Sequence, residues 1–193
     1  MIRSLYDWTM RLAAHSHSKW MLGIISFIES SFFPIPPDVL LIPMILANRR
    51  HAWRLALLCT FASVLGGVLG YAIGYFLFDQ IGEPLLTFYG YSTEFESFKL
   101  SYNESGAWIV LTAGMTFIPF KIITILSGMT GMDPITFIIF SIIGRGSRFL
   151  LEATLLWFYG ERIKTFIESR LQLVTAIFCI LLLMGIIMSK HLL

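Results

Sequence analysis

Two carboxylates, Glu29 and Asp38, lie in a part of the sequence that is otherwise apolar. They flank the prolines of ESSFFPIPPDVLLIP, which covers residues 29–43, and the nine residues on either side of the acidic pair carry no charge. A carboxylate removed from bulk water binds its proton more tightly and can titrate near neutral pH. Glu29 and Asp38 are therefore predicted to bind and release protons. In the alternative interpretation, both acids lie at a membrane interface as ordinary solvated groups.

Three cations complement these acids. Arg145 and Arg148 lie in GRGSRF, three residues apart and hence on one face of a helix, and Lys121 follows a proline in FIPFK. Arginine forks bind phosphate oxygens in pairs, and the N-termini of half-helices add partial positive charge. The three cations are therefore predicted to bind the phosphate of an anionic lipid headgroup. In the alternative interpretation they only neutralise buried acids, Glu152 included.

The composition is typical of a membrane protein. Of the 193 residues, 56% are hydrophobic and 13% are charged, and the mean hydropathy is +0.77, far from the balance of a soluble domain. No linker-like segment interrupts the chain, so residues 1–193 are expected to form one membrane domain. The net charge of +2 is too small to indicate a nucleic-acid partner. The histidines and the two cysteines lack the spacing of metal sites, so neither a metal nor a cofactor is expected.

Three segments are predicted to span the membrane: residues 53–79, 134–159 and 171–190. Their lengths are close to or above the roughly 20 residues that cross a hydrocarbon core. The segment 134–159 carries three charged residues and must therefore face protein or water along part of its length. In residues 1–16, apolar positions recur at helical spacing between charges, a pattern typical of an amphipathic helix in the headgroup plane.

Two further apolar segments, residues 20–47 and 107–132, are each interrupted by proline. The predicted breaks are at Pro34, Pro36, Pro37 and Pro119. On either side of its break each segment is too short to cross a bilayer, and proline forces extended backbone there. Each segment is therefore predicted to form a re-entrant hairpin, which enters and leaves by the same face and whose tip lines a cavity.

The predicted fold class is an all-α integral membrane protein with two inverted repeats, each a re-entrant hairpin followed by a transmembrane helix. A hairpin returns to its own side while one span crosses, so the second copy must be inverted relative to the first. Cations flank the first hairpin, whereas the link at residues 80–105 is rich in acids. By the positive-inside rule the N-terminus is cytoplasmic and the link lies outside. An odd number of crossings places the C-terminus outside as well, although Lys190 and His191 oppose this.

Three motifs cover the breaks and the first full span. They are E-x-x-x-x-P-x-P-x-D from Glu29 to Asp38, G-x-x-x-G-Y-x-x-G from Gly66 to Gly74, and G-x-x-F-x-P from Gly114 to Pro119. The glycine run by itself indicates only a ridge of small residues for close helix packing. Together the motifs resemble the DedA family of bacterial inner-membrane proteins, which shares its fold with eukaryotic VTT-domain scramblases, and in particular its YqaA-like branch. The resemblance covers nearly the whole chain.

The resemblance implies two re-entrant hairpins in inverted repeat and a role in moving lipids between leaflets. It also implies undecaprenyl phosphate and phospholipids as substrates, and dependence on the proton gradient. The acidic pair of the family corresponds to Glu29 and Asp38. The arginines of its R-F-x-P-x-x-R motif fall at Thr116 and Ile122, neither of which is basic. Lys121 and the two arginines of the following span are expected to take their place.

The leading functional hypothesis is a lipid translocase of the bacterial inner membrane, coupled to protons. Its partners would be membrane lipids with anionic headgroups, and a homo-oligomeric state is left open. The alternative is a proton-coupled transporter of a small ion or solute, in which the same acids carry the ion and no lipid moves. An intramembrane enzyme would need a nucleophile or a metal constellation, and the sequence has neither, so the chain is not expected to be an enzyme.

Overall fold

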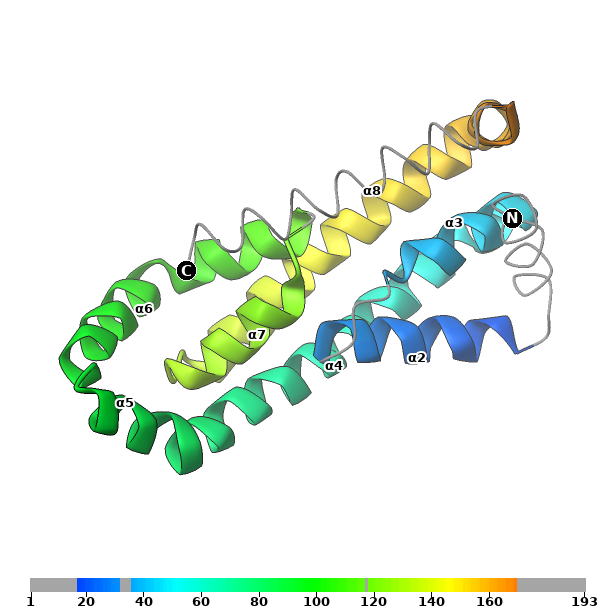
Figure 1. The fold of residues 1–193 in the computed structure, drawn as a ribbon. Coiled ribbons are helices and arrows are strands. Elements are labelled where there is room, and N and C mark those ends of the chain that lie inside the picture. The colour runs from blue at the N-terminus through cyan, green and yellow to red at the C-terminus, as the bar shows by residue number, and fades with distance from the viewer. Residues whose placement is uncertain (1–16, 32–35, 117, 170–193) are drawn as a thin grey trace.

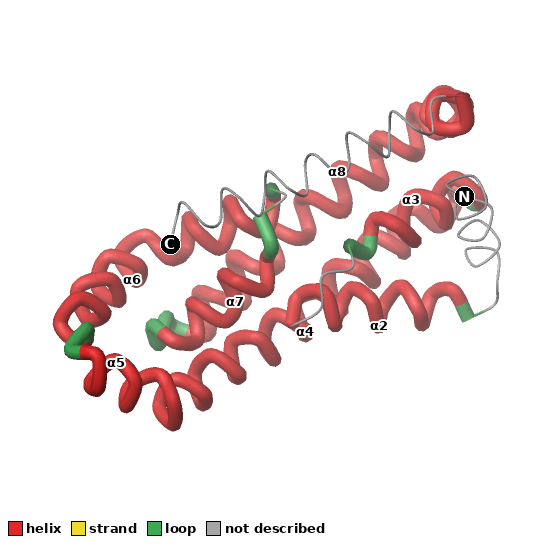
Figure 2. The backbone as a smooth tube through the Cα atoms, in the orientation of Figure 1, coloured by secondary structure: helices red, strands yellow, loops and turns green. Residues whose placement is uncertain are grey.

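The computed structural model describes residues 17–31, 36–116 and 118–169, and every element within these ranges is helical (Figures 1 and 2). The elements are α2 (Ser18–Ser31), α3 (Asp38–Ala47), the 3-10 turn η1 (Arg49–His51), α4 (Ala52–Leu77), the π-helical turn η2 (Phe78–Gly82), α5 (Glu83–Tyr89), α6 (Ser92–Met115), α7 (Phe120–Met129) and α8 (Pro134–Ser169). The predicted all-α class is confirmed for this part of the chain. The predicted amphipathic helix at 1–16 and the predicted span at 171–190 lie outside the described residues.

Two helical stretches are long and apolar enough to cross a bilayer. One runs from Arg49 to Tyr89 through η1, α4, η2 and α5, and the other is the first part of α8, Pro134–Gly160. The shorter of the two has 27 residues, which at 1.5 Å per residue gives about 40 Å, more than the ~30 Å of a hydrocarbon core. They contain the predicted spans 53–79 and 134–159. α8 continues beyond the second of these to Ser169.

The helices α2, α3 and α7 are too short to cross. They have 14, 10 and 10 residues, so the longest of them measures about 21 Å. At each break a proline directly precedes the second short helix, where its missing N–H group is not needed for a helical hydrogen bond. α3 starts directly after Pro37, whose φ of −65° suits the start of a helix, and α7 starts directly after Pro119. Pro36 precedes α3, and Pro34 lies outside the described residues.

The link at residues 80–105 is almost entirely helical. α5 ends at Tyr89 and is followed by Gly90, whose φ of +76° favours glycine, and α6 begins at Ser92. α6 begins well before residue 107, where the sequence predicts the second apolar segment to begin. The first helix of the second pair is therefore longer than predicted. Aromatic rings at helical spacing stabilise the polar half of α6, with centroid distances of 6.1 and 5.7 Å along the series Phe95, Phe98 and Tyr102.

The other helices pack around α4 and α8, which contact each other. α2 and α7 pack on α4, whereas α3 and α6 pack on α8. In Figure 1 the end of α2 and the start of α3 lie near the middle of the molecule, as do the end of α6 and the start of α7, and the two helix pairs open toward opposite ends. The apolar interior accordingly has two clusters, one among α2, α3, α4 and α8, and one where α6 and α7 meet the start of α8.

Gly66, Gly70 and Gly74 line the face of α4 that receives α2 and α7. A methyl group on Gly66 would overlap the carbonyl oxygen of Phe27 in α2, and one on Gly74 would overlap that of Ile125 in α7. Gly70 lies between them and faces both helices. The small-residue packing ridge predicted from the sequence is confirmed.

Replacing Asp133 with Asn is expected to lower the thermal stability at neutral pH and to leave it unchanged in strong acid. The Asp133 carboxylate accepts hydrogen bonds of 2.7 Å from the backbone N–H and the hydroxyl of Thr136 at the start of α8. These hydrogen bonds lower the pKa of Asp133. A lowered folded-state pKa stabilises the protein above the unfolded-state pKa, and this stabilisation is lost as the pH falls through the folded-state pKa. Thermal unfolding of both proteins across pH measures the difference, and a constant difference down to strong acid would contradict the assignment.

Candidate functional site

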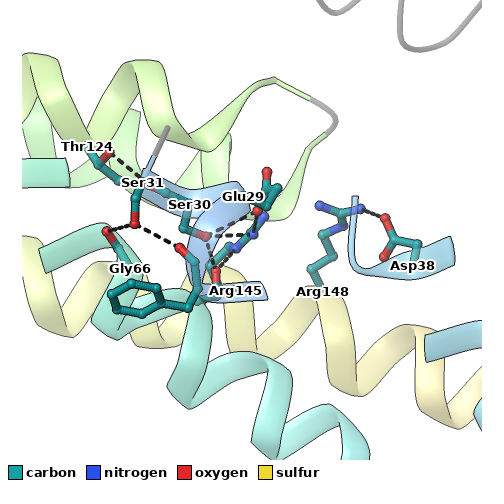
Figure 3. Close-up of polar contacts among 10 residues, drawn as sticks. Glu29, Ser30, Ser31, Asp38, Gly66, Thr124, Arg145 and Arg148 are labelled. Atoms are coloured by element: carbon teal, nitrogen blue, oxygen red, sulfur yellow. Dashed lines mark hydrogen bonds and ion pairs between the residues drawn. The ribbon is translucent and has the colours of Figure 1, made fainter. Parts of the chain in front are cut away.

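The most deeply buried charge in the described part of the chain is Arg145 of α8, with 1% of its surface exposed. Its guanidinium forms an ion pair with Glu29 in the last turn of α2 (Figure 3). It also donates to the hydroxyl of Ser63 in α4 through Nε at 2.5 Å and to that of Ser30 in α2 through Nη2 at 3.1 Å. A buried charge is tolerated when it is paired and hydrogen-bonded, and Arg145 meets both conditions. It thereby joins α2, α4 and α8.

Aromatic rings cover the same guanidinium. Cζ of Arg145 lies 4.9 Å from the ring centroid of Phe120 and 5.1 Å from that of Phe149. Both rings are fully buried, and a cation in this position is attracted to the ring faces. Phe120 is the first residue of α7, directly after the break at Pro119. The start of α7 therefore also contacts the Arg145 site.

A second ion pair joins α3 to α8. Nη2 of Arg148 lies 2.5 Å from Oδ2 of Asp38, and the two side chains are 15% and 8% exposed. Asp38 is the first residue of α3, where the partial positive charge of the helix N-terminus also stabilises a carboxylate. Its other oxygen, Oδ1, is buried and has no hydrogen-bond partner among the described residues. The two acids that flank the proline break are thus each bound to an arginine of α8.

The two helix pairs meet at their breaks. The hydroxyl of Thr124 in α7 donates to the carbonyl oxygen of Ser30 at 3.2 Å, and this contact is buried. The hydroxyl of Ser31, the last residue of α2, donates to the carbonyl oxygen of Gly66 at 2.9 Å. Figure 3 shows these contacts beside the Glu29–Arg145 pair. The end of α2, the first turns of α7 and the glycine face of α4 therefore enclose one polar site.

Comparison with known protein families identifies the fold. A family model for the VTT domain matches residues 35–158. The chain belongs to the VTT domain family. The match includes Asp38, the glycine face of α4 and both arginines of α8, and this agrees with the resemblance that the sequence motifs indicated.

Two relatives of this VTT protein are similar over most of their length. An uncharacterised protein from Haemophilus influenzae is 34% identical over 171 residues, which cover 89% of this chain and 88% of the relative. An uncharacterised protein from Histophilus somni is 35% identical over 171 residues, 89% of each chain. No solved structure matches this VTT protein.

The structure brings together four of the five charged residues that the sequence singles out. In this conformation of the VTT protein, Arg145 and Arg148 are bound to Glu29 and Asp38, as in the alternative interpretation in which the cations neutralise buried acids. Lys121 is half-buried in the first turn of α7; its backbone carbonyl oxygen accepts from the hydroxyl of Thr124, and its ammonium group forms no hydrogen bond or ion pair within the described part of the chain. The phosphate-binding role of Lys121, Arg145 and Arg148 stays a prediction.

Sequence reasoning missed the two serines of the site. The hydroxyl groups of Ser30 and Ser63 are 2.6 Å apart and both contact Arg145. A signal for Ser63 was available, because it lies three and seven residues before Gly66 and Gly70 and hence on the same face of α4. Ser30 is adjacent to Glu29, but both Ser30 and Ser31 are buried, and nothing in the sequence says which of them contacts the arginine.

A cleft of about 430 Å³ lies at the other end of α7, where the VTT protein's link helices meet α4. Aromatic and charged side chains line it, among them Tyr75, Phe78, Asp79, Glu96 and Lys99. None of the residues that form the two ion pairs lines this cleft. The ion-pair site and the cleft are therefore separate features of the fold.

Proposed function

We propose that this VTT protein is a membrane transporter that moves a phosphate-bearing lipid, undecaprenyl phosphate or a phospholipid, between leaflets. The observation that carries the proposal is the pair of arginines held inside the helical bundle by Glu29 and Asp38, beside a proline break. A phosphate group, like a carboxylate, offers two oxygens that accept parallel hydrogen bonds from the planar fork of a guanidinium. A lipid phosphate can therefore replace either carboxylate as the partner of its arginine.

Protonation supplies a way to exchange the partners. A neutral carboxyl group at Glu29 or Asp38 attracts its arginine far less than a carboxylate does, so proton binding frees the guanidinium for an anion. When the lipid leaves, loss of the proton restores the ion pair and closes the site. Each acid thus serves as a proton-coupling group and its arginine as a phosphate-binding group, and Lys121 at the break of α7 adds positive charge for the arriving headgroup. No covalent step is involved.

The proposed architecture is an inverted repeat of two re-entrant hairpins, α2–α3 and α6–α7, followed by the spans α4 and α8. The packing supports it because equivalent helices make equivalent contacts. The first short helix of each pair packs on the span that follows it, α2 on α4 and α6 on α8. The second packs on the span of the other repeat, α3 on α8 and α7 on α4. Such repeats place substrate sites where broken helices meet near the bilayer midplane. The polar site lies where α2 and α7 meet.

We place the protein in the bacterial inner membrane, with several crossings and a cytoplasmic N-terminus. Cations gather near the end of the first helix pair at Arg49, Arg50 and Arg54, and acids gather in the link at Asp79, Glu83, Glu94, Glu96 and Glu104. Positively charged loops remain in the cytoplasm. The link is therefore assigned to the outer side.

A second candidate function is a proton-coupled transporter of a small ion or solute. The observation that favours it is that Glu29 and Asp38 already neutralise both arginines, so a cycle of proton exchange needs no lipid anion. In vesicles without lipid exchange, such a protein would still dissipate a pH gradient.

Exchange of a labelled phosphate-bearing lipid between leaflets of proteoliposomes is expected to fall to the protein-free background in the Arg148→Gln variant. Glutamine keeps hydrogen-bond donors but removes the positive charge that binds phosphate. Arg162→Gln is the matched control, because Arg162 lies on the same helix and is exposed. Exchange at the wild-type rate in a correctly folded Arg148→Gln protein would contradict the phosphate-binding role.

A further inference from the structure

Glu152 is a third acid near the site and belongs to neither the Glu29–Arg145 nor the Asp38–Arg148 ion pair. It follows Arg148 by four residues on α8 and hence lies on the same face. Its half-buried carboxyl group is close enough to Asp38 for a hydrogen bond between the two carboxyl groups. Asp38 uses Oδ2 to bind Arg148, while its Oδ1 is buried without a partner among the described residues. Two ionised carboxylates side by side would both be acceptors, and neither would have a donor for the other.

The charges of the site lead to the same conclusion. Asp38 and Glu152 share one arginine, Arg148, while Glu29 has its own partner in Arg145. Full ionisation would leave one excess negative charge, and an unpaired charge away from water is far less favourable than a neutral acid. One proton on the acids removes the excess.

Among the described residues, the groups around Glu152 leave the proton on Asp38 or Glu152. The charged groups that act on it are Asp38 from α3 and Arg148 from its own helix. From α4, the thiol of Cys59 faces the same acids. From η1, Arg49 lies against Gly160, two helical turns further along α8. The proton is therefore assigned to the two neighbouring carboxyl groups.

We propose that Asp38 and Glu152 share one proton and that its position selects the partner of Arg148. With the proton on Glu152, its O–H donates to Oδ1 of Asp38, and Arg148 binds Asp38, joining α3 to α8. When the proton moves to Asp38, an O–H bond forms there and the bond on Glu152 breaks, leaving a charged carboxylate on Glu152. Arg148 then pairs with Glu152 within α8 and releases α3. The transfer conserves the number of protons and the net charge of the pair.

This inference concerns the proton site itself, and only its link to lipid movement rests on the proposed function. It makes Glu152 the third acid of the site, a role that neither the sequence motifs nor the ion pairs assign to it. It also gives α3 two states, bound to α8 or released, that are separated by one proton transfer over a hydrogen bond.

Infrared spectroscopy of the purified wild-type protein at neutral pH is expected to show the band of a protonated carboxyl group, and Glu152→Gln is expected to lose it. Glutamine can still donate to Oδ1 of Asp38, so this variant is expected to fold. Glu104→Gln, which changes an exposed acid of α6, should keep the band. Absence of the band in the wild type, or its persistence in Glu152→Gln, would overturn the proposal.

The second variant, Asp38→Asn, tests the switch. It carries a neutral group at residue 38 and should release Arg148 to Glu152, whereas Glu152→Gln should keep Arg148 on Asp38. Cysteine pairs between α3 and α8 in otherwise cysteine-free protein are therefore expected to crosslink more in Glu152→Gln than in Asp38→Asn, and equal crosslinking would overturn the switch. The infrared band and the crosslinks could both behave as expected while the protein exchanges no lipid between leaflets. That result would support the shared proton and contradict the proposed function.

Discussion

Replacing Arg145 with Ala is expected to destabilise the protein more than any other single change of a charged residue in the site. Glu29 would remain near the interior as an unpaired carboxylate, and the hydroxyl groups of Ser30 and Ser63 would lose their common donor. Removing one partner of a buried ion pair costs about 3–5 kcal/mol. The free energy of unfolding in detergent, measured with a chemical denaturant, should fall by this amount.

Three further variants make this prediction specific. Arg162→Ala removes an exposed arginine from the same helix and should change the free energy of unfolding little. Arg145→Lys should rescue only part of the loss, because an ammonium cannot reproduce the fork that reaches Glu29 and both serines. Arg145→Met combined with Glu29→Gln should be more stable than Arg145→Ala, because the unpaired charge is gone. Equal stability of Arg145→Ala and wild type would mean that Arg145 is not buried as described.

Replacing Gly66 with Ala is expected to have the second large effect, a loss of about 2–3 kcal/mol. The added methyl group would overlap the backbone carbonyl of Phe27, and backbone cannot rotate away as a side chain can. The hydroxyl of Ser31 lies within hydrogen-bond distance of both backbones at this approach, 2.8 Å from the carbonyl oxygen of Phe27 and 2.9 Å from that of Gly66. Because α2 would have to move away from α4, Glu29 would move with it, so lipid exchange should fall together with stability.

Gly23→Ala is the matched control for Gly66→Ala. A methyl group on Gly23, in the interior of α2, would lie 3.7 Å from a side-chain carbon of Leu58, which is ordinary van der Waals contact. Alanine is favoured over glycine in a helix interior by about 1 kcal/mol, so this variant should be as stable as wild type or slightly more stable. Equal destabilisation of both variants would contradict the prediction, because helix propensity favours alanine at both positions and only the methyl group on Gly66 would meet backbone.

The outline of the fold could be predicted because hydrophobicity and proline act locally. Apolar runs long enough to cross a bilayer indicated the two long helices, and prolines such as Pro119 marked where the second short helix of a pair begins. The glycine spacing of Gly66, Gly70 and Gly74 predicted close packing, although not which helices would pack there. Two different helices, α2 and α7, share that face, and only the tertiary structure shows this.

The details that could not be predicted depend on partners far apart in the sequence. The acids and cations were recognised separately, but Glu29 and Arg145 are 116 residues apart, and sequence spacing does not reveal which acid meets which arginine. The polar start of α6 was missed for another reason. Its helix is stabilised by Phe95, Phe98 and Tyr102 at helical spacing, a weaker signal than an uninterrupted apolar run.

The most direct test of the proposed function is leaflet exchange of labelled undecaprenyl phosphate and of labelled phospholipid in proteoliposomes that contain the wild-type protein, with a pH gradient monitored in the same vesicles. A lipid translocase that uses paired arginines and protonatable acids predicts exchange of at least one of these lipids well above the protein-free background. It also predicts that the exchange rate changes when the gradient is collapsed. Dissipation of the gradient with no exchange of either lipid would contradict it and would identify the protein as a carrier of ions or solutes.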